Sequence, residues 1–314
     1  PEDCTCGGTQ NSHQHLLALF APGGQPAALE LDLLSVSEDP ASSNGNGILD
    51  IGAYCICFEP AKLFLHNFPY YAPFGPQDSV QQMQAVRAVY DEIPWLTEQF
   101  ESEYGQVLLG LHGWDNYHLG TTDPWDTVED LQGVKIGGAG PNLPWLEYAG
   151  AVPVQSTLPD GYLSLQTGVY HGWLMFPSAY LGFKFYEPSP NYTLIGFGAM
   201  GVNALTMNQR SFDALPEDVR QIIVEVGREY EARAGESLNA RQVSGLEGLR
   251  EVGANIKELG EEARAQWAES LAAFPGEQAR EADGRGMPGT EVMKAYLRAV
   301  DATGYEWPYV YSID

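Results

Sequence analysis

Positively charged side chains are scarce in this chain. Its 314 residues include 16 Lys and Arg against 42 Asp and Glu, which gives a formal net charge of −26 at pH 7. A surface of this sign repels phosphate backbones and anionic lipid headgroups, so nucleic acid and acidic membranes are excluded as partners. The same charge suits a salty medium, where repulsion between carboxylates is screened.

Long apolar runs are also missing. No segment approaches the ~20 residues that a membrane-spanning helix needs. The chain does not begin with a basic segment followed by an apolar one, so we expect any signal peptide to have been removed. Apolar residues nevertheless make up 44% of the sequence and aromatic residues 11%. This composition is enough for substantial cores, in one large domain or in two.

Cysteine is rare, with four residues in two Cys-x-Cys pairs, Cys4 with Cys6 and Cys55 with Cys57. Side chains at i and i+2 of a strand share a face, so two neighbouring strands could be joined by two disulfides. This geometry favours bonds between the two pairs over a bond within either pair. The alternatives are free structural thiols and a four-thiolate metal site, although zinc sites usually have a wider cysteine spacing. Disulfides would indicate an extracytoplasmic location.

Strand and helix patterns alternate along the chain. They predict an α/β architecture with mostly parallel sheets. The longest helical pattern begins near Pro216, a residue suited to the first helical position, and its apolar residues follow the 3.6-residue period. Strands are expected at 48–57, 106–113, 134–136, 152–154, 168–176, 194–208 and 253–259, and helices at 78–104 with a break at Pro94, 143–148, 160–167, 178–186, 261–273 and 291–302.

The sequence shows no assembled catalytic signature. Residues 196–201 (GFGAMG) match G-x-G-x-x-G, but no helix pattern follows to receive a pyrophosphate. His13 and His15 lack an acidic or cysteine partner at a recognisable spacing, and no serine lies in G-x-S-x-G. We therefore expect a protein that binds a molecule without transforming it and that needs no cofactor or metal. The alternative is an α/β enzyme, which requires His118 or His171 beside a carboxylate and a nucleophile.

Several motifs over residues 130–218 occur together in one known family. In chain order they are D-L-x-G-x-K-I, G-A-x-P-V, L-Q-T-G, K-F-Y-E and M-N-x-x-x-F-D-x-L-P-E-D. This set resembles the solute-binding subunit of tripartite ATP-independent periplasmic (TRAP) transporters. The resemblance is clear over roughly 105–232 and fair over 48–104.

The resemblance implies an extracytoplasmic receptor with the two-lobed α/β fold of periplasmic binding proteins. Such a receptor closes over a small organic solute and delivers it to the permease subunits in the membrane. Its chain crosses between the lobes more than once, and a long helix spans both. On this basis lobe I takes residues 1–121 plus 209–314, and lobe II takes 122–208. A carrier or sensor without a role in transport is a further alternative.

The family usually has an arginine directly after K-I, where it pairs with the solute's carboxylate, but this chain has Gly137. Glycine removes both the charge and the fork that recognises a carboxylate. An organic acid would then rest on the N–H groups of residues 138–143 at a helix start, aided by asparagine side chains. The competing hypothesis is a cationic, zwitterionic or apolar solute held by aromatic faces, with Glu59 or Glu147 as counter-charge. The candidate ligand-binding residues are Tyr54, Glu59, Tyr71, Trp114, Asn116, Tyr117, Gly137, Gly138, Asn142, Trp173, Phe176, Phe197 and Asn203.

Overall fold

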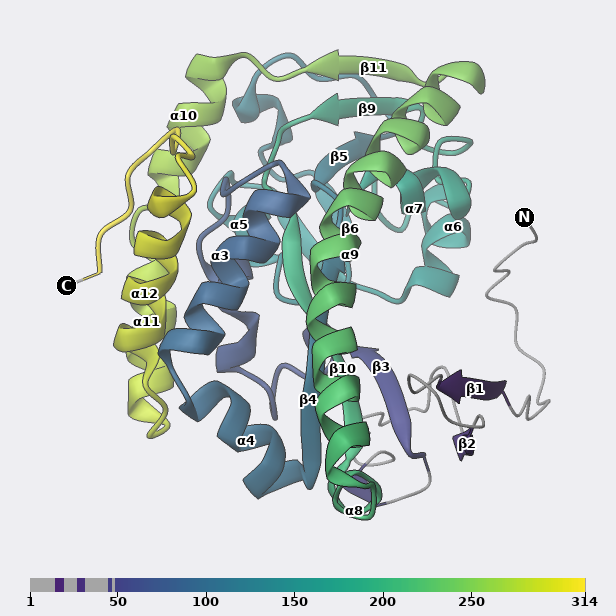
Figure 1. Cartoon of the computed structure of the whole chain (residues 1–314). Helices are drawn as coiled ribbons and strands as arrows, with labels where there is room; N and C mark the ends of the chain where they lie inside the picture. The colour runs from purple at the N-terminus through teal and green to yellow at the C-terminus, as the bar shows by residue number, and fades with distance from the viewer. Residues whose placement is uncertain (1–14, 20–26, 32–44, 47–48, 314) are drawn as a thin grey trace.

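The computed structural model describes residues 15–19, 27–31, 45–46 and 49–313, and these form two larger sheets and one small one (Figure 1). The α/β fold class expected from the sequence is confirmed. The small sheet pairs β1 (His15–Leu19) with β2 (Ala27–Leu31). The three-stranded sheet has the order β3 (Ile51–Cys55), β10 (Met200–Asn208), β4 (Gln106–Trp114), and the six-stranded sheet has the order β11 (Asn255–Glu258), β9 (Asn191–Leu194), β5 (His118–Thr121), β8 (Gly172–Met175), β6 (Lys135–Gly138), β7 (Val152–Gln155).

The expectation of mostly parallel sheets is wrong. Both pairings in the three-stranded sheet are antiparallel, and β5 is antiparallel to both of its neighbours. Only the pairs β11–β9, β6–β7 and β6–β8 are parallel among the described strands of these two sheets. The reason is connectivity. β4 continues into β5, and β9 into β10, in the other sheet, so these two crossings run in opposite directions and their strands pair antiparallel in both sheets, β4 with β10 and β5 with β9.

Helices cover the sheets and follow the sequence pattern closely in the first half of the chain. The segment 78–104 forms two helices with a break at Pro94. The Asp78 carboxylate caps the first helix by accepting hydrogen bonds from the Val80 and Gln81 N–H groups. The second helix ends at Gly105, which has φ +60°. The helices are α2 (Phe68–Tyr71), α3 (Ser79–Glu92), α4 (Trp95–Tyr104), α5 (Pro144–Glu147), α6 (Leu158–Gln166), α7 (Pro177–Gly182), α8 (Gln209–Asp213), α9 (Glu217–Glu251), α10 (Glu261–Ser270), α11 (Phe274–Gly284) and α12 (Gly289–Ala302).

The long helix expected from Pro216 is α9, although Pro216 occupies its N-cap position. Its 35 residues span about 52 Å, and Figure 1 shows it running past both larger sheets. Glycines bring its backbone close to its neighbours. A Cβ on Gly227 would lie 2.0 Å from the Leu109 carbonyl oxygen, and one on Gly245 would lie 2.6 Å from the Ser178 nitrogen. α9 therefore contacts β4 of the three-stranded sheet at one end and α7, beside the six-stranded sheet, at the other.

The chain passes between the two larger sheets at residues 115–117, at 195–199 and along α9. The division into lobes expected from the sequence stays a prediction. The sheet pairings bear on two strands in it: β5 and β11 fall in lobe I by that division, but they belong to the six-stranded sheet.

The disulfide pairing expected from the sequence is wrong for the second Cys-x-Cys pair. Cys55 is bonded to Cys57, and their Cα atoms lie 5.2 Å apart, within the range that a disulfide can bridge. β3 ends at Cys55 and a 3-10 turn begins at Ile56, so the two side chains do not share the face of one strand. Cys4 and Cys6 lie outside the described residues.

We expect the Cys57→Ser variant to fold with a free energy of unfolding about 1–2 kcal/mol below that of the wild type. The disulfide joins residues only two apart, and closing so short a loop removes little entropy from the unfolded chain. Urea unfolding of both proteins measures the loss, and a reducing agent should lower the stability of the wild type alone. Non-reducing peptide mapping that links Cys55 or Cys57 to Cys4 or Cys6 would contradict the pairing.

The helices of the described segments include none that is both long enough and apolar enough to cross a bilayer. The same segments hold no group of three or more His, Cys, Asp or Glu side chains that could bind a metal ion. The thiols of Cys55 and Cys57 are consumed by their disulfide, so the four-thiolate site considered from the sequence has lost half of its ligands.

Candidate functional site

The candidate solute site is the interface between the two larger sheets, which we call the cleft. The loops after β6 and β8 leave the carboxyl ends of parallel strands, where ligands bind in open α/β sheets. Phe176, directly after β8, stacks on Trp114 at the end of β4, with ring centroids 5.3 Å apart and planes 11° apart. In the loop after β6, a Cβ on Gly140 would lie 3.5 Å from the Cys57 carbonyl oxygen. The walls of the cleft are therefore in contact.

An aromatic layer beside the cleft joins the two halves of the molecule. Trp145 of α5 stacks on Tyr70 of α2 and on Phe197, with centroid distances of 5.7 and 5.0 Å. Its Nε1 donates to the Tyr70 carbonyl at 2.8 Å, and its own carbonyl accepts from Trp267 Nε1 at 3.0 Å. Tyr117 meets Trp145 edge-on, and its hydroxyl lies 3.1 Å from that of Tyr70. The candidates Tyr117 and Phe197 thus lie in a packed layer, each 5% exposed or less.

We expect Trp145→Phe to lower the free energy of unfolding by about 1–3 kcal/mol, because the phenyl ring keeps the stacking but leaves the buried Tyr70 carbonyl without its donor. Urea unfolding measures the change. Trp114→Phe is a matched control, since Trp114 is only partly buried and its stacking on Phe176 survives the change. Equal losses in the two variants would contradict a specific role of the Trp145 hydrogen bond.

Two candidate tyrosines are held in the core around the three-stranded sheet. The Tyr54 hydroxyl donates to Gln106 Oε1 at 3.1 Å, and the Tyr71 hydroxyl donates to the Phe64 carbonyl at 2.6 Å. Burial raises the pKa of Tyr71 well above its usual range. Both hydroxyls are therefore engaged within the protein, and a solute contact through either residue stays a prediction.

The candidate counter-charges are not buried carboxylates. Glu59 lies at partial exposure, with an oxygen 3.6 Å from the Lys62 amine, and Glu147 is exposed on α5. An exposed carboxylate keeps its hydration, so neither side chain offers a strong site for a desolvated cation as the chain is folded here.

The three candidate asparagines differ in how their amides are used. Asn116 is fully bonded, because its Nδ2 donates to a glutamine side chain and its Oδ1 accepts from the Gly198 N–H, both at 2.9 Å. Asn203 Nδ2 lies 2.9 Å from His112 Nε2. The Oδ1 atoms of Asn203 and Asn142 have no hydrogen-bond partner among the described residues, although the two residues are only 4% and 1% exposed.

Two titratable groups lie near the end of β4, beside Trp114. Burial lowers the pKa of His112 to about 4; a hydrogen bond to the Gly113 backbone opposes this, and the charge of Arg241 adds to it. Burial raises the pKa of Asp115 to about 6, against hydrogen bonds that include those from Ser178. At neutral pH the histidine is therefore neutral and the aspartate is ionised. His112 was not among the candidates, although it shares a strand face with Trp114, two residues on.

The profile of the family described as "Bacterial extracellular solute-binding protein, family 7" (DctP) matches residues 67–281. The chain belongs to this family. It is therefore a solute-binding receptor of the TRAP type and not an enzyme, and the family is extracytoplasmic.

Individual relatives agree with this assignment. The C4-dicarboxylate-binding periplasmic protein DctP of Rhodobacter capsulatus is 28% identical over 285 residues, which cover 82% of each chain. A solute-binding protein of Sulfitobacter sp. is 28% identical over 137 residues, and the match spans 43% of this chain and 41% of that relative. A TRAP solute-binding protein from Rhodoferax ferrireducens, solved with benzoate, has the same fold, with a TM-score of 0.75, 19% identity and coverage of 85% and 83%.

Position 137 in this receptor cannot accept any side chain without a rearrangement. A Cβ there would lie 2.6 Å from Trp173 Cε3 and 2.8 Å from Tyr170 Cε2. Gly137 and Trp173 are direct partners in the sheet, and Trp173 is fully buried. At Gly138 a Cβ would lie 2.9 Å from a methyl of Leu143. The space into which a side chain at position 137 would extend is therefore filled by the indole, and solute contact through Trp173 stays a prediction.

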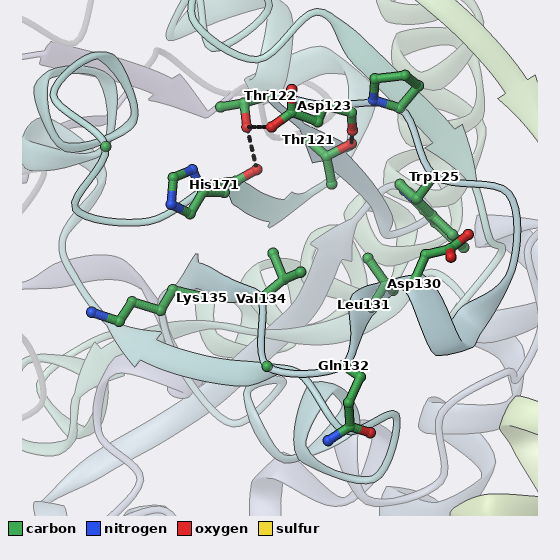
Figure 2. A pocket seen from close by; sticks show the side chains of 13 residues that line it. Thr121, Thr122, Asp123, Trp125, Asp130, Leu131, Gln132, Val134, Lys135 and His171 are labelled. Atoms are coloured by element: carbon green, nitrogen blue, oxygen red, sulfur yellow. Dashed lines mark hydrogen bonds between the residues drawn. The ribbon is translucent and has the colours of Figure 1, made fainter.

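A hollow of about 480 Å³ lies at the opposite edge of the six-stranded sheet (Figure 2). Thr121, at the end of β5, and Lys135, at the start of β6, help to line it, together with His171. In Figure 2 the Thr122 hydroxyl lies 3.3 Å from the His171 carbonyl oxygen and 3.2 Å from Asp123 Oδ2. This edge carries the amino ends of β6 and β8, away from the side where α/β sheets bind ligands.

The histidines of the enzyme alternative are not arranged for catalysis. His118 Nδ1 accepts from the Gly196 N–H at 3.1 Å, and burial lowers its pKa to about 3. His171 is exposed, and no hydrogen bond of its ring occurs within the described segments. His118 thus supports the segment that crosses between the sheets.

Proposed function

We propose that this receptor closes its two lobes over one small organic solute in the cleft and delivers the solute to the permease subunits of a TRAP transporter. The observation that carries the proposal is the Trp114–Phe176 stack, which joins the end of β4 to the loop after β8. The stack lies beside the first crossing at 115–117, where Ser178 Oγ donates to Asp115 at 3.1 Å, so a solute bound against it contacts both sheets and favours their closure.

In this proposal each lobe is built on one of the larger sheets. The lobe boundaries expected from the sequence, near 121/122 and 208/209, are kept. The exceptions are β5 and β11, which are assigned to the lobe of the six-stranded sheet. The chain segments 115–117 and 195–199 then serve as hinges. Hinges are short segments that absorb changes in backbone dihedral angles, and Gly196 and Gly198, at φ +73° and +110°, lie in the second of them.

The solute class remains the open part of this function. The family and its dicarboxylate-binding relative favour an organic acid, held by backbone N–H groups of residues 138–143. The filled space at Gly137 and the aromatic pair Trp114 and Phe176 favour the alternative, a cationic, zwitterionic or apolar solute.

The experiment is a thermal-shift screen of the solute-stripped protein against organic acids, amines, zwitterions and neutral polyols. A ligand that binds only the folded state raises the melting temperature by mass action. We expect at least one class to do so, and Trp114→Ala to abolish the shift. If no class raises the melting temperature and native mass spectrometry finds no small molecule on the protein as purified, the proposed function is wrong.

A further inference from the structure

Two buried amide oxygens beside the cleft lack a partner. Asn142 follows Gly140 in the loop after β6, and its Oδ1 lies 3.6 Å from where a Cβ on Gly138 would be. Asn203 is paired across the three-stranded sheet with Cys55 and His112. Neither Oδ1 accepts a hydrogen bond within the described part of the chain. A buried acceptor without a donor costs about 1–3 kcal/mol, and a solute that brings a donor removes this cost.

The orientation of the Asn203 amide follows from its neighbour. The Asn203 Nδ2 lies 2.9 Å from His112 Nε2. An amide nitrogen of asparagine can only donate, so Nε2 is the acceptor in this bond. The Asn203 Oδ1 is left as an acceptor only.

An arginine without an ion pair lies on the helix beside the same region. The Arg241 guanidinium has no hydrogen bond or ion pair within 4 Å among the described residues, and its charge lowers the pKa values of His112 and of the Asp115 carboxyl nearby. Tyr230, whose ring centroid is 6.1 Å from that of His112, lies eleven residues earlier, and eleven residues are close to three helical turns. The next residue, Gln242, accepts from the Asn116 N–H at 3.3 Å. Arg241 thus shares the face of α9 that meets His112, near the first crossing between the sheets.

These groups favour a ligand different from the simple carboxylate that an arginine at position 137 would bind. The acceptors at Asn142 and Asn203 need N–H donors and repel a carboxylate, which has acceptors alone. A guanidinium favours a carboxylate in a bidentate arrangement. Aromatic faces such as those of Trp114 and Phe176 attract a cationic group and can pack against the apolar part of the same ligand.

We propose that the solute is a small zwitterion, which donates N–H groups to the amide oxygens of Asn142 and Asn203 and places its carboxylate on Arg241, with its apolar part against Trp114 and Phe176. This inference rests on the proposed function. In it Arg241 on α9 supplies the carboxylate contact and position 137 supplies none, because Trp173 and Tyr170 fill the space beside Gly137.

The test is calorimetric titration of the solute-stripped protein with matched probes on one carbon ring: proline as the zwitterion, cyclopentanecarboxylate as the acid and pyrrolidine as the amine. Sets on a six-membered ring and on an open chain accompany it. We expect at least one zwitterion to bind at least about tenfold more tightly than its acid and its amine, since one charged contact is lost in each. Equal or tighter binding of an acid or an amine would overturn the inference and leave the receptor function standing. Failure of every probe, together with failure of the thermal-shift screen, would overturn the receptor function itself.

Variants then test the assigned residues. Arg241 is exposed, so Arg241→Gln should fold normally and weaken zwitterion binding by about tenfold or more while leaving the melting temperature of the empty protein unchanged. Arg233→Gln is the matched control, because Arg233 lies on α9 in an exposed pair with Glu229. Asn142→Ala should weaken the binding of the zwitterion and of the amine but leave the binding of the acid unchanged. Unchanged zwitterion affinity in Arg241→Gln, or equal loss in the control, would contradict the assignment.

Discussion

Gly137→Arg, which introduces the arginine that the sequence resemblance predicts at this position, is expected to lower the free energy of unfolding by about 3 kcal/mol or more and to give no gain in carboxylate affinity. The first carbon of the new side chain would meet the indole of Trp173 at 2.6 Å and the ring of Tyr170 at 2.8 Å. Overpacking of this kind costs about 1–3 kcal/mol. The guanidinium would add the cost of a buried charge without a partner.

Chemical unfolding and calorimetric titration with a dicarboxylate measure the two outcomes. Gly182→Ala is the matched control, because a Cβ there meets nothing within 4 Å and Gly182 is not among the residues at positive φ; its stability should change by less than about 1 kcal/mol. The double variant Gly137→Arg with Trp173→Ala should recover part of the loss, since the two residues share one space. A stable single variant that binds dicarboxylates would show that the indole moves aside.

The sequence predicts the parts of this fold that depend on local pattern. The helical segment 78–104 with its break at Pro94 and the long helix from Pro216 follow from periodicity and proline. The antiparallel pairing of β5 with β9 and of β10 with β4 does not, because it depends on two crossings between the sheets that run in opposite directions. The bond between Cys55 and Cys57 also escaped prediction, since a strand through residue 57 was assumed, whereas the strand ends at Cys55.

The candidate site is predictable to a similar degree. Motifs located the strand with Gly137 and predicted that a carboxylate-binding arginine is missing there, but they could not show that Trp173 fills the space beside Gly137. From the sequence alone, all three candidate asparagines could contact the solute equally well. Only their partners separate them, because Asn116 is saturated while Asn142 and Asn203 each keep an unpaired oxygen. Partners of this kind come from residues far apart in the chain.

A second large effect is expected from acid. Burial lowers the pKa values of His66 and His112 to about 4 and that of His118 to about 3, from 6.5. Between pH 6.5 and these values the unfolded chain binds protons that the folded chain excludes, so stability falls as the pH falls. Near pH 5 these histidines contribute close to three protons to unfolding. Burial raises the pKa of Asp115 to about 6 and that of Glu231 above its usual value, and each acts in the opposite direction by up to one proton.

The balance is an uptake of one to two protons on unfolding near pH 5, and each proton is worth about 1.4 kcal/mol per pH unit. We therefore expect the free energy of unfolding to fall by about 1.4–2.7 kcal/mol per pH unit between pH 6 and pH 5. Urea unfolding at pH 7.5, 6 and 5 measures the slope. His118→Asn should reduce the slope by about 1.4 kcal/mol per pH unit. A free energy of unfolding that stays constant or rises as the pH falls would mean that the buried histidines take up protons in the folded state. The packing around His112 and His118 would then have to open in acid.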